Sequence, residues 1–235
     1  MLWQIPVIAQ DPAYHAMADQ RTLLGIPNFA NAMSNLAFLA AGLAGLRATA
    51  RSHFADAWER QPWFALFAGT LLTAFGSTWY HLAPDDARLV WDRVPMTLGF
   101  MGLLAAMLAE RIGLQPTRKA FAPLLILGIT SVLFWTWTGN LLLYVLVQFG
   151  SLLAVVALLT LRPARYPGTE WLVTALAAYA VSKVLESEDQ TIYHVGQIVS
   201  GHTLKHLLAA AGVGCLALRA AKIAKACKNA SSSPY

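Results

Sequence analysis

The sequence predicts an all-α membrane protein, folded as a single bundle of about seven transmembrane helices with its N-terminus outside and its C-terminus in the cytoplasm. Of its 235 residues, 57% are hydrophobic and only 12% are charged, whereas about one quarter of a soluble domain is charged. Because lipid offers the backbone no hydrogen-bond partners, long apolar stretches must form helices or closed barrels. The apolar runs here are long and lack the alternation of barrel strands, so they predict helices.

The predicted spans are the apolar runs between charged residues, prolines and glycines. At about 1.5 Å per residue, about 20 residues cross the hydrocarbon layer. The fourth and sixth runs are the shortest, so six spans is the alternative count. The chain divides into an extracytoplasmic segment 1–28, a helical domain 29–221 and a basic, polar cytoplasmic tail 222–235. The runs cover 29–49, 62–82, 90–110, 121–138, 140–161, 169–186 and 198–220.

The basic residues predict the orientation, because short cytoplasmic loops of membrane proteins collect Lys and Arg. Most of the seventeen basic residues fall in alternate connections and in the tail, while the other side carries mainly carboxylates. The net charge of +5 is spread over short loops, so we expect no nucleic-acid partner. The basic residues on the predicted cytoplasmic side are Arg47, Arg51, Arg60, Arg111, Arg118, Lys119, Arg162, Arg165, Arg219, Lys222, Lys225 and Lys228.

Polar and ionisable side chains are costly inside a membrane, so the few in the predicted spans are functional candidates. The second run ends GSTWYH, which places Ser77 and His81 on one helix face. The last run opens SGHTLKH, where His202 and His206 have the spacing by which a helix offers two imidazoles to one metal. Asp92 begins the third run. The predicted topology brings all five residues to the outer face of the membrane.

Three imidazoles with a fourth position left open are the ligand set of a catalytic zinc, which activates a water molecule. His81, His202 and His206 are therefore the predicted zinc ligands. A carboxylate such as Asp92 would balance the charge of the metal and could move a proton. Ser77, one turn before a ligand, is placed to donate a hydrogen bond to a developing oxyanion.

Each candidate also has a structural explanation. A histidine at a helix end is often an interfacial side chain. Asp92 could cap a helix that has Pro95 in its first turn, and Ser77 could bond back to a helix carbonyl. Lys205 lies between the two histidines of the last run but on another helix face, so we expect it to reach outward or to pair with an outer carboxylate.

Taken together, the motifs resemble those of the alkaline ceramidases, which belong to the CREST superfamily. The shared pattern is S-x-x-x-H ending the second span, Asp beginning the third and H-x-x-x-H opening the last. The stretch NFANAMSN in the first span is also similar to the family's N-T-x-S-N, so the resemblance covers essentially the whole chain. It implies zinc at His81, His202 and His206, catalytic roles for Ser77 and Asp92, and hydrolysis of the N-acyl amide of ceramide.

The resemblance also raises the question of calcium, which animal members of the family bind through an acidic, tryptophan-containing N-terminal segment. Here that segment reads ADQRTLLGIPNFAN. Asp19, Asn28 and Asn31 offer oxygen ligands, but Gln20 and Arg21 stand where an aromatic residue and further acid are expected. Compact loops and alanine-rich spans suggest a bacterial homologue in the inner membrane, with the site toward the periplasmic leaflet.

The expected function is that of a zinc-dependent lipid amidohydrolase, which cleaves ceramide or another N-acyl lipid to a fatty acid and a free amine lipid. The alternative is a receptor-like protein that keeps a structural zinc and has no turnover, as the adiponectin-receptor branch suggests by analogy. A retinal protein would explain a lysine in the last span and an acid in the third. That explanation leaves both His202 and His206 without a role, and it places Lys205 near the membrane boundary.

Overall fold

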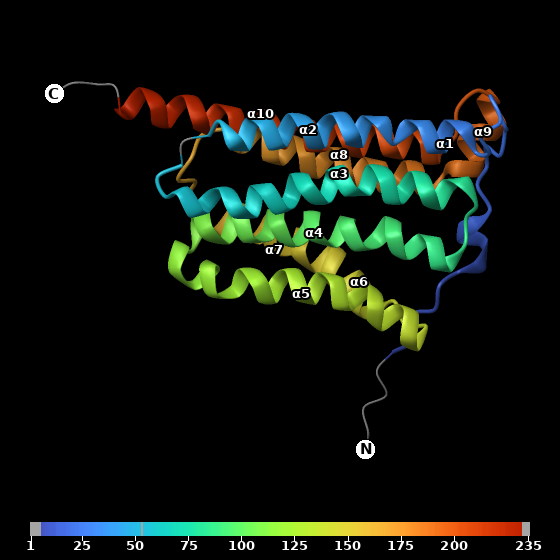
Figure 1. Ribbon diagram of the computed structural model, residues 1–235, viewed down its shortest axis with the longest axis horizontal. Coiled ribbons are helices and arrows are strands. Elements are labelled where there is room, and N and C mark those ends of the chain that lie inside the picture. Colours follow the sequence, from blue (N-terminus) through green and yellow to red (C-terminus); the bar gives the residue numbers. More distant parts are fainter. Residues whose placement is uncertain (1–5, 53, 232–235) are drawn as a thin grey trace, which may run out of the picture.

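The computed structural model describes residues 6–52 and 54–231, with side chains described as far as Ile223. In this part of the chain the long helices lie side by side along the longest dimension of the molecule and form one bundle (Figure 1). The elements are η1 (Pro12–His15), α1 (Phe29–Ser34), α2 (Leu36–Ala50), η2 (Ala57–Glu59), α3 (Arg60–Leu82), α4 (Asp86–Arg111), α5 (Leu114–Thr138), α6 (Leu142–Val145), the π-helical η3 (Leu146–Gly150), α7 (Ser151–Leu161), α8 (Thr169–Ser187), α9 (Asp189–Gly196) and α10 (Gly201–Ser231).

Five helical segments of the described chain are long and apolar enough to cross a membrane, which confirms the predicted class of helical membrane protein. They coincide with the first, third, fourth, fifth and seventh predicted runs. The second and sixth runs coincide with α3 and α8, which have similar lengths. The five segments are Phe29–Ala50, Asp86–Arg111, Leu114–Thr138, Leu142–Leu161 and Gly201–Ile223.

Three predicted boundaries need correction. The helix α5 begins at Leu114, seven residues before the predicted start at 121, so the fourth run is not a short one. The helix α4 begins at Asp86 because the side chain of Asp85 caps it, accepting a hydrogen bond from the backbone N–H of Arg88 at 2.7 Å. Asp92 therefore lies inside the helix, and the interpretation of Asp92 as a cap is wrong. At the other end of the chain, α10 continues to Ser231, because the alanines and lysines after Arg219 favour helix. The boundary predicted at 222 thus falls within a helix.

The close contact between α3 and α4 depends on Gly76. A Cβ atom at this position would lie 1.9 Å from the carbonyl oxygen of Trp91, so only glycine lets the two helices approach this closely. The contact places Ser77, the next residue of α3, beside Asp92 of α4.

The two ends of the bundle differ in the polar residues they bury, and we name them accordingly. The histidine end is where α3 meets α4 and α10 begins, and it contains His81, His202 and His206. The arginine end is where α4, α7 and the described part of α10 end, and it contains Arg111 and Arg219.

The N-terminal segment 6–18 crosses the histidine end (Figure 1). The backbone N–H of Ile8 donates to Asn140 Oδ1 at 3.0 Å, and the N–H of Ala18 donates to Asp189 Oδ2 at 2.9 Å. These bonds tie the segment to the α5–α6 turn and to α9, so it lies over this end of the bundle.

Candidate metal centre

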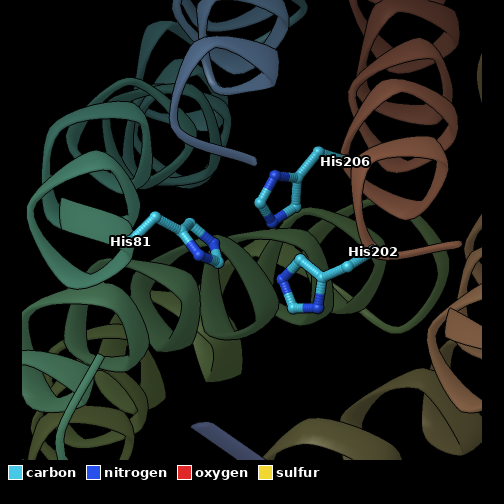
Figure 2. A group of neighbouring side chains, drawn as sticks. All are labelled: His81, His202 and His206. Carbon is cyan, nitrogen blue, oxygen red and sulfur yellow. The ribbon is translucent and has the colours of Figure 1, made fainter. Parts of the chain in front are cut away.

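His81, His202 and His206 meet at the histidine end, although more than a hundred positions separate the first from the others. Their rings turn toward a common point (Figure 2), with centroids 4.9, 5.0 and 4.8 Å apart. One nitrogen from each ring lies within 4.8 Å of the others, and all three residues are buried. The prediction that these side chains come together is therefore confirmed, and the group could hold a metal ion.

The start of α10 fixes the positions of His202 and His206. Ser200 caps the helix, because its Oγ accepts a hydrogen bond from the N–H of Thr203 at 3.2 Å. The N–H of His202 donates to Asp189 Oδ1 at 2.6 Å. Gly201 allows this turn to press against α8, since a Cβ atom there would lie 2.1 Å from the carbonyl oxygen of Leu185.

Hydrogen bonds also orient the His206 ring. Its Nδ1 lies 2.8 Å from Ser34 Oγ, and the Ser34 hydroxyl donates its proton to the carbonyl oxygen of Asn31 at 2.8 Å. The Ser34 oxygen must therefore accept from Nδ1–H, which leaves Nε2 of His206 with a free lone pair. A ring held in this way by its second nitrogen is typical of metal-ligating histidines.

His81 gives the strongest indication that the pocket suits an ion. Both of its ring nitrogens are buried, and neither has a hydrogen-bond partner among the residues that the structure describes. Buried polar atoms are almost always bonded, and leaving one unpaired is costly. A metal ion accepting a lone pair from this ring would remove the cost, so the donor set fits a metal.

Lys205 departs from its expected outward position. Its Nζ lies 2.5 Å from Glu186 Oε1 and 3.3 Å from Nε2 of His202. The predicted pairing with a carboxylate at this end is confirmed, but the side chain turns into the bundle. A lysine ammonium and a metal ion would compete for the lone pair of His202, and Glu186 gives the ammonium a separate partner.

A cavity of 390 Å³ runs from this centre along the bundle. Its polar end includes Ser77, Asp92 and His206, and its remaining length is lined mainly by apolar side chains of α3, α4, α7, α8 and α10. Ser77 and Leu66 are both in its wall, and at about 1.5 Å per residue they lie about 16 Å apart along α3. The apolar part is lined by residues such as Leu66, Leu103, Leu152, Leu172, Val213 and Leu216.

The residues predicted to bind calcium make bonds within the chain. Arg21 holds the carboxylate of Asp19 through two N–H groups at 2.8 and 2.7 Å, and this pairing lowers the pKa of Asp19. Asn28 donates to the carbonyl oxygen of His81 at 2.9 Å, and Asn31 Oδ1 accepts from the Thr203 hydroxyl at 2.8 Å. Calcium binding at these residues stays a prediction.

The sequence analysis did not place four further polar residues in this cavity. Tyr14, Arg93, Lys183 and Glu186 all line its polar end together with Lys205. The signal that could have identified three of them is the one used for Asp92, a charged residue within or at the edge of a predicted span.

No protein-family model matches the chain, and a search of curated proteins also finds no match.

Proposed function

We propose that this chain is a metal-dependent lipid amidohydrolase of the membrane, similar to the alkaline ceramidases, which cleaves an N-acyl amide to a fatty acid and a free amine. One observation carries the proposal. A cluster of three buried histidines, of which His206 lines the wall, adjoins the polar end of a long, mainly apolar cavity, which suits a substrate with a reactive polar group and a hydrocarbon chain.

Zinc is the metal we propose, because three imidazoles with a remaining open position are typical of catalytic zinc. When bound, zinc lowers the pKa of a water molecule and polarises a carbonyl group. His81, His202 and His206 would hold it. Ser34 supports the arrangement by fixing the ring of His206.

Asp92 would transfer the proton, and Ser77 would stabilise the negative charge that develops on the amide oxygen. Asp92 lies beside Ser77 in the cavity wall, next to the histidine cluster. A carboxylate in this position can take the proton of the attacking water and return it to the leaving nitrogen. The Ser77 hydroxyl can donate a hydrogen bond to the carbonyl oxygen of the amide as negative charge develops there.

The cavity would also bind the substrate. The acyl chain would occupy its apolar length, and burial of the chain would hold the amide at the polar end. The amine half would then lie in the chamber around Arg93, Lys183 and Glu186.

We propose seven spans, with the histidine end toward the outside and the C-terminus in the cytoplasm. The helices α3 and α8 pack beside the five apolar segments and have similar lengths. The distribution of basic residues supports this orientation through the positive-inside tendency. In a bacterial inner membrane the site would face the periplasmic leaflet, from which lipid substrates would reach it.

The proposal can be tested with purified protein in detergent. Fatty-acid release is measured from a panel of N-acyl lipids that includes ceramide, using metal-stripped protein and the same protein with zinc restored. We expect release that depends on zinc and is lost in His202→Ala. No release above the metal-stripped control would contradict the proposal and favour a receptor-like protein with a structural metal.

A further inference from the structure

The polar end of the cavity, which we call the headgroup chamber, contains more buried positive than negative charge. Its wall includes three cationic side chains, Arg93, Lys183 and Lys205, and two carboxylates that are at least partly buried, Asp92 and Glu186; the third carboxylate in the lining, Asp11, is exposed. Glu186 is shared by both lysines, because it pairs with Lys183 and with Lys205. One carboxylate thus serves two ammonium groups.

Arg93 has no counter-ion. Among the residues that the structure describes, no carboxylate lies within salt-bridge distance of its guanidinium, and the side chain is almost fully buried, with 6% of its surface exposed. Its Nη2 donates to the neutral Gln10 side chain at 2.6 Å, whereas its Nη1 is buried without a partner.

Aromatic rings hold the Arg93 guanidinium in place. The guanidinium carbon lies 4.4 Å from the Trp135 ring centroid, 4.9 Å from that of Tyr144 and 5.6 Å from that of Tyr14. These contacts recover part of the cost of removing the cation from water. They do not neutralise its charge, and a buried charge without a counter-ion remains costly.

A bound anion would complete this arrangement. The planar guanidinium suits the geometry of a carboxylate or phosphate group. Arg93 follows Asp92 directly in α4, and both line the same cavity. An anion paired with Arg93 would therefore lie close to the amide that Asp92 serves.

Building on the proposed hydrolase function, we propose that the preferred substrates are N-acyl amphiphiles whose amine half carries an anionic group that pairs with Arg93. The shared chemistry is a carboxylate or phosphate separated by a short spacer from the amide nitrogen. A neutral headgroup such as that of ceramide would leave Arg93 without a counter-ion and would bind more weakly.

Three probes with the same acyl chain test this proposal. N-palmitoylglycine carries a carboxylate, N-palmitoyl phosphoethanolamine carries a phosphate, and N-palmitoylethanolamine is neutral. Equilibrium binding is measured to the His202→Ala variant in detergent, so that turnover does not interfere. We expect at least one anionic probe to bind about tenfold more tightly than the neutral one, as one charge-assisted hydrogen bond provides, and the two anionic probes separate carboxylate from phosphate.

Variants of two arginines on the same helix locate the effect. Adding Arg93→Gln should reduce the anionic preference to near unity, and Arg93→Lys should keep part of it because the charge remains. Arg88→Gln is the matched control. Arg88 pairs with Asp85, lies over the Trp79 ring and does not line the cavity, so its removal should leave the preference intact.

The outcomes are distinguishable from those of the proposed function. Equal binding of all three probes by the protein with Arg93 intact overturns the headgroup proposal, whatever the variants do. A preference that survives Arg93→Gln overturns the assignment to Arg93. Hydrolysis of the same probes by the wild-type protein is measured separately, so Arg93-dependent binding without hydrolysis would contradict the enzyme proposal and leave the anion site standing.

Discussion

The histidine end and the arginine end both bury polar side chains and both contain matched pairs, but the buried charges have counter-ions at the arginine end. There, Glu110 accepts two hydrogen bonds from Nη2 of Arg219 at 2.9 and 2.7 Å. Arg219 leaves two other nitrogens without partners, but its charge has a counter-ion. At the histidine end, within the described part of the chain, His81 has no hydrogen-bond partner at either ring nitrogen and no carboxylate lies within salt-bridge distance of Arg93.

The pair of Glu59 and Tyr166 near the arginine end follows the same rule. The Tyr166 hydroxyl donates to the buried Glu59 carboxylate at 3.0 Å. Burial raises the pKa of Tyr166 to about 12, so this donor keeps its proton at neutral pH. Matched polar groups of this kind join helices, whereas a buried cation without a counter-ion, or a buried ring with no bonded nitrogen, is where we propose that another molecule or ion binds. Five predictions test this difference.

The largest effect is expected from removing a histidine of the cluster. Replacing His202 with alanine should abolish bound metal and fatty-acid release together, because two imidazoles hold an ion far less well than three. Elemental analysis of the purified protein and a hydrolysis assay measure the two effects. His194→Ala on α9, where the histidine is exposed, is the control and should change neither. Full metal content in His202→Ala would remove the proposed centre.

The second prediction separates chemistry from metal binding at the same end. Asp92→Asn preserves the shape of the side chain and should keep the metal, but it should lower kcat by about 10²- to 10⁴-fold because a general base is lost. The exposed carboxylate of Asp86 on the same helix provides the control, Asp86→Asn. Unchanged turnover in Asp92→Asn would exclude its proposed role.

At the arginine end, replacing a buried carboxylate with its amide should lower the stability of the protein and leave metal binding unchanged. Glu110→Gln leaves the fully buried Arg219 without its counter-ion, which should cost about 3–5 kcal/mol in the free energy of unfolding. Denaturant titration in detergent measures the loss. Glu170→Gln removes a surface pair with Lys222 and should have no measurable effect. Equal stability of the two variants would contradict the structural role of Glu110.

A smaller change should follow from loosening the His206 ring. Ser34→Ala removes the hydrogen bond to Nδ1 and should weaken metal affinity by about 10- to 100-fold. Competition with a chelator provides the measurement. Ser52→Ala is a matched control, because Ser52 is also a buried serine but bonds to carbonyl oxygens of Ala48 and Ala220 far from the cluster. An equal loss of affinity in both variants would show a general effect on the bundle.

The smallest effect concerns pH and the pair formed by the buried Asp19 and the exposed Arg21. Hydrogen bonds from Arg21 lower the pKa of Asp19 below its ordinary value of 3.8. Stabilisation by this pair is therefore complete at neutral pH and is lost as the pH falls from 3.8 through the lower value in the folded protein. The melting temperature of wild type should exceed that of Arg21→Gln at pH 7, and the difference should shrink in acid. A difference that does not change with pH would contradict this linkage.

The histidine cluster was predictable from the sequence because the signals were local and the topology supplied the long-range link. Two histidines four positions apart share a helix face, and alternation of the spans brought His81 to the same depth. The helices themselves were predictable because apolar length is a property of composition. The helix boundaries were less predictable, as the cap at Asp85 and the continuation of α10 beyond residue 222 show.

The headgroup chamber was harder to predict because it depends on which way long side chains turn. The flexible side chain of Lys205 could reach outward or inward without a change in the backbone. It turns inward in the structure, where it pairs with Glu186 of the neighbouring α8. Arg93 gave no local signal beyond its charge, since its aromatic neighbours come from three distant segments. Hydropathy also cannot distinguish an apolar face toward lipid from one toward a cavity.

The N-terminal segment that crosses the histidine end has a consequence for biogenesis. Ile8 is bonded to a residue 132 positions later, and Ala18 to one 171 positions later. During synthesis this segment leaves the ribosome before its anchors, which follow only with the α5–α6 turn and α9. The N-terminal segment, whose Gln10 and Tyr14 line the cavity, can therefore be fastened over the headgroup chamber only after α9 has been made, and a nascent chain stopped before α9 would lack this cover.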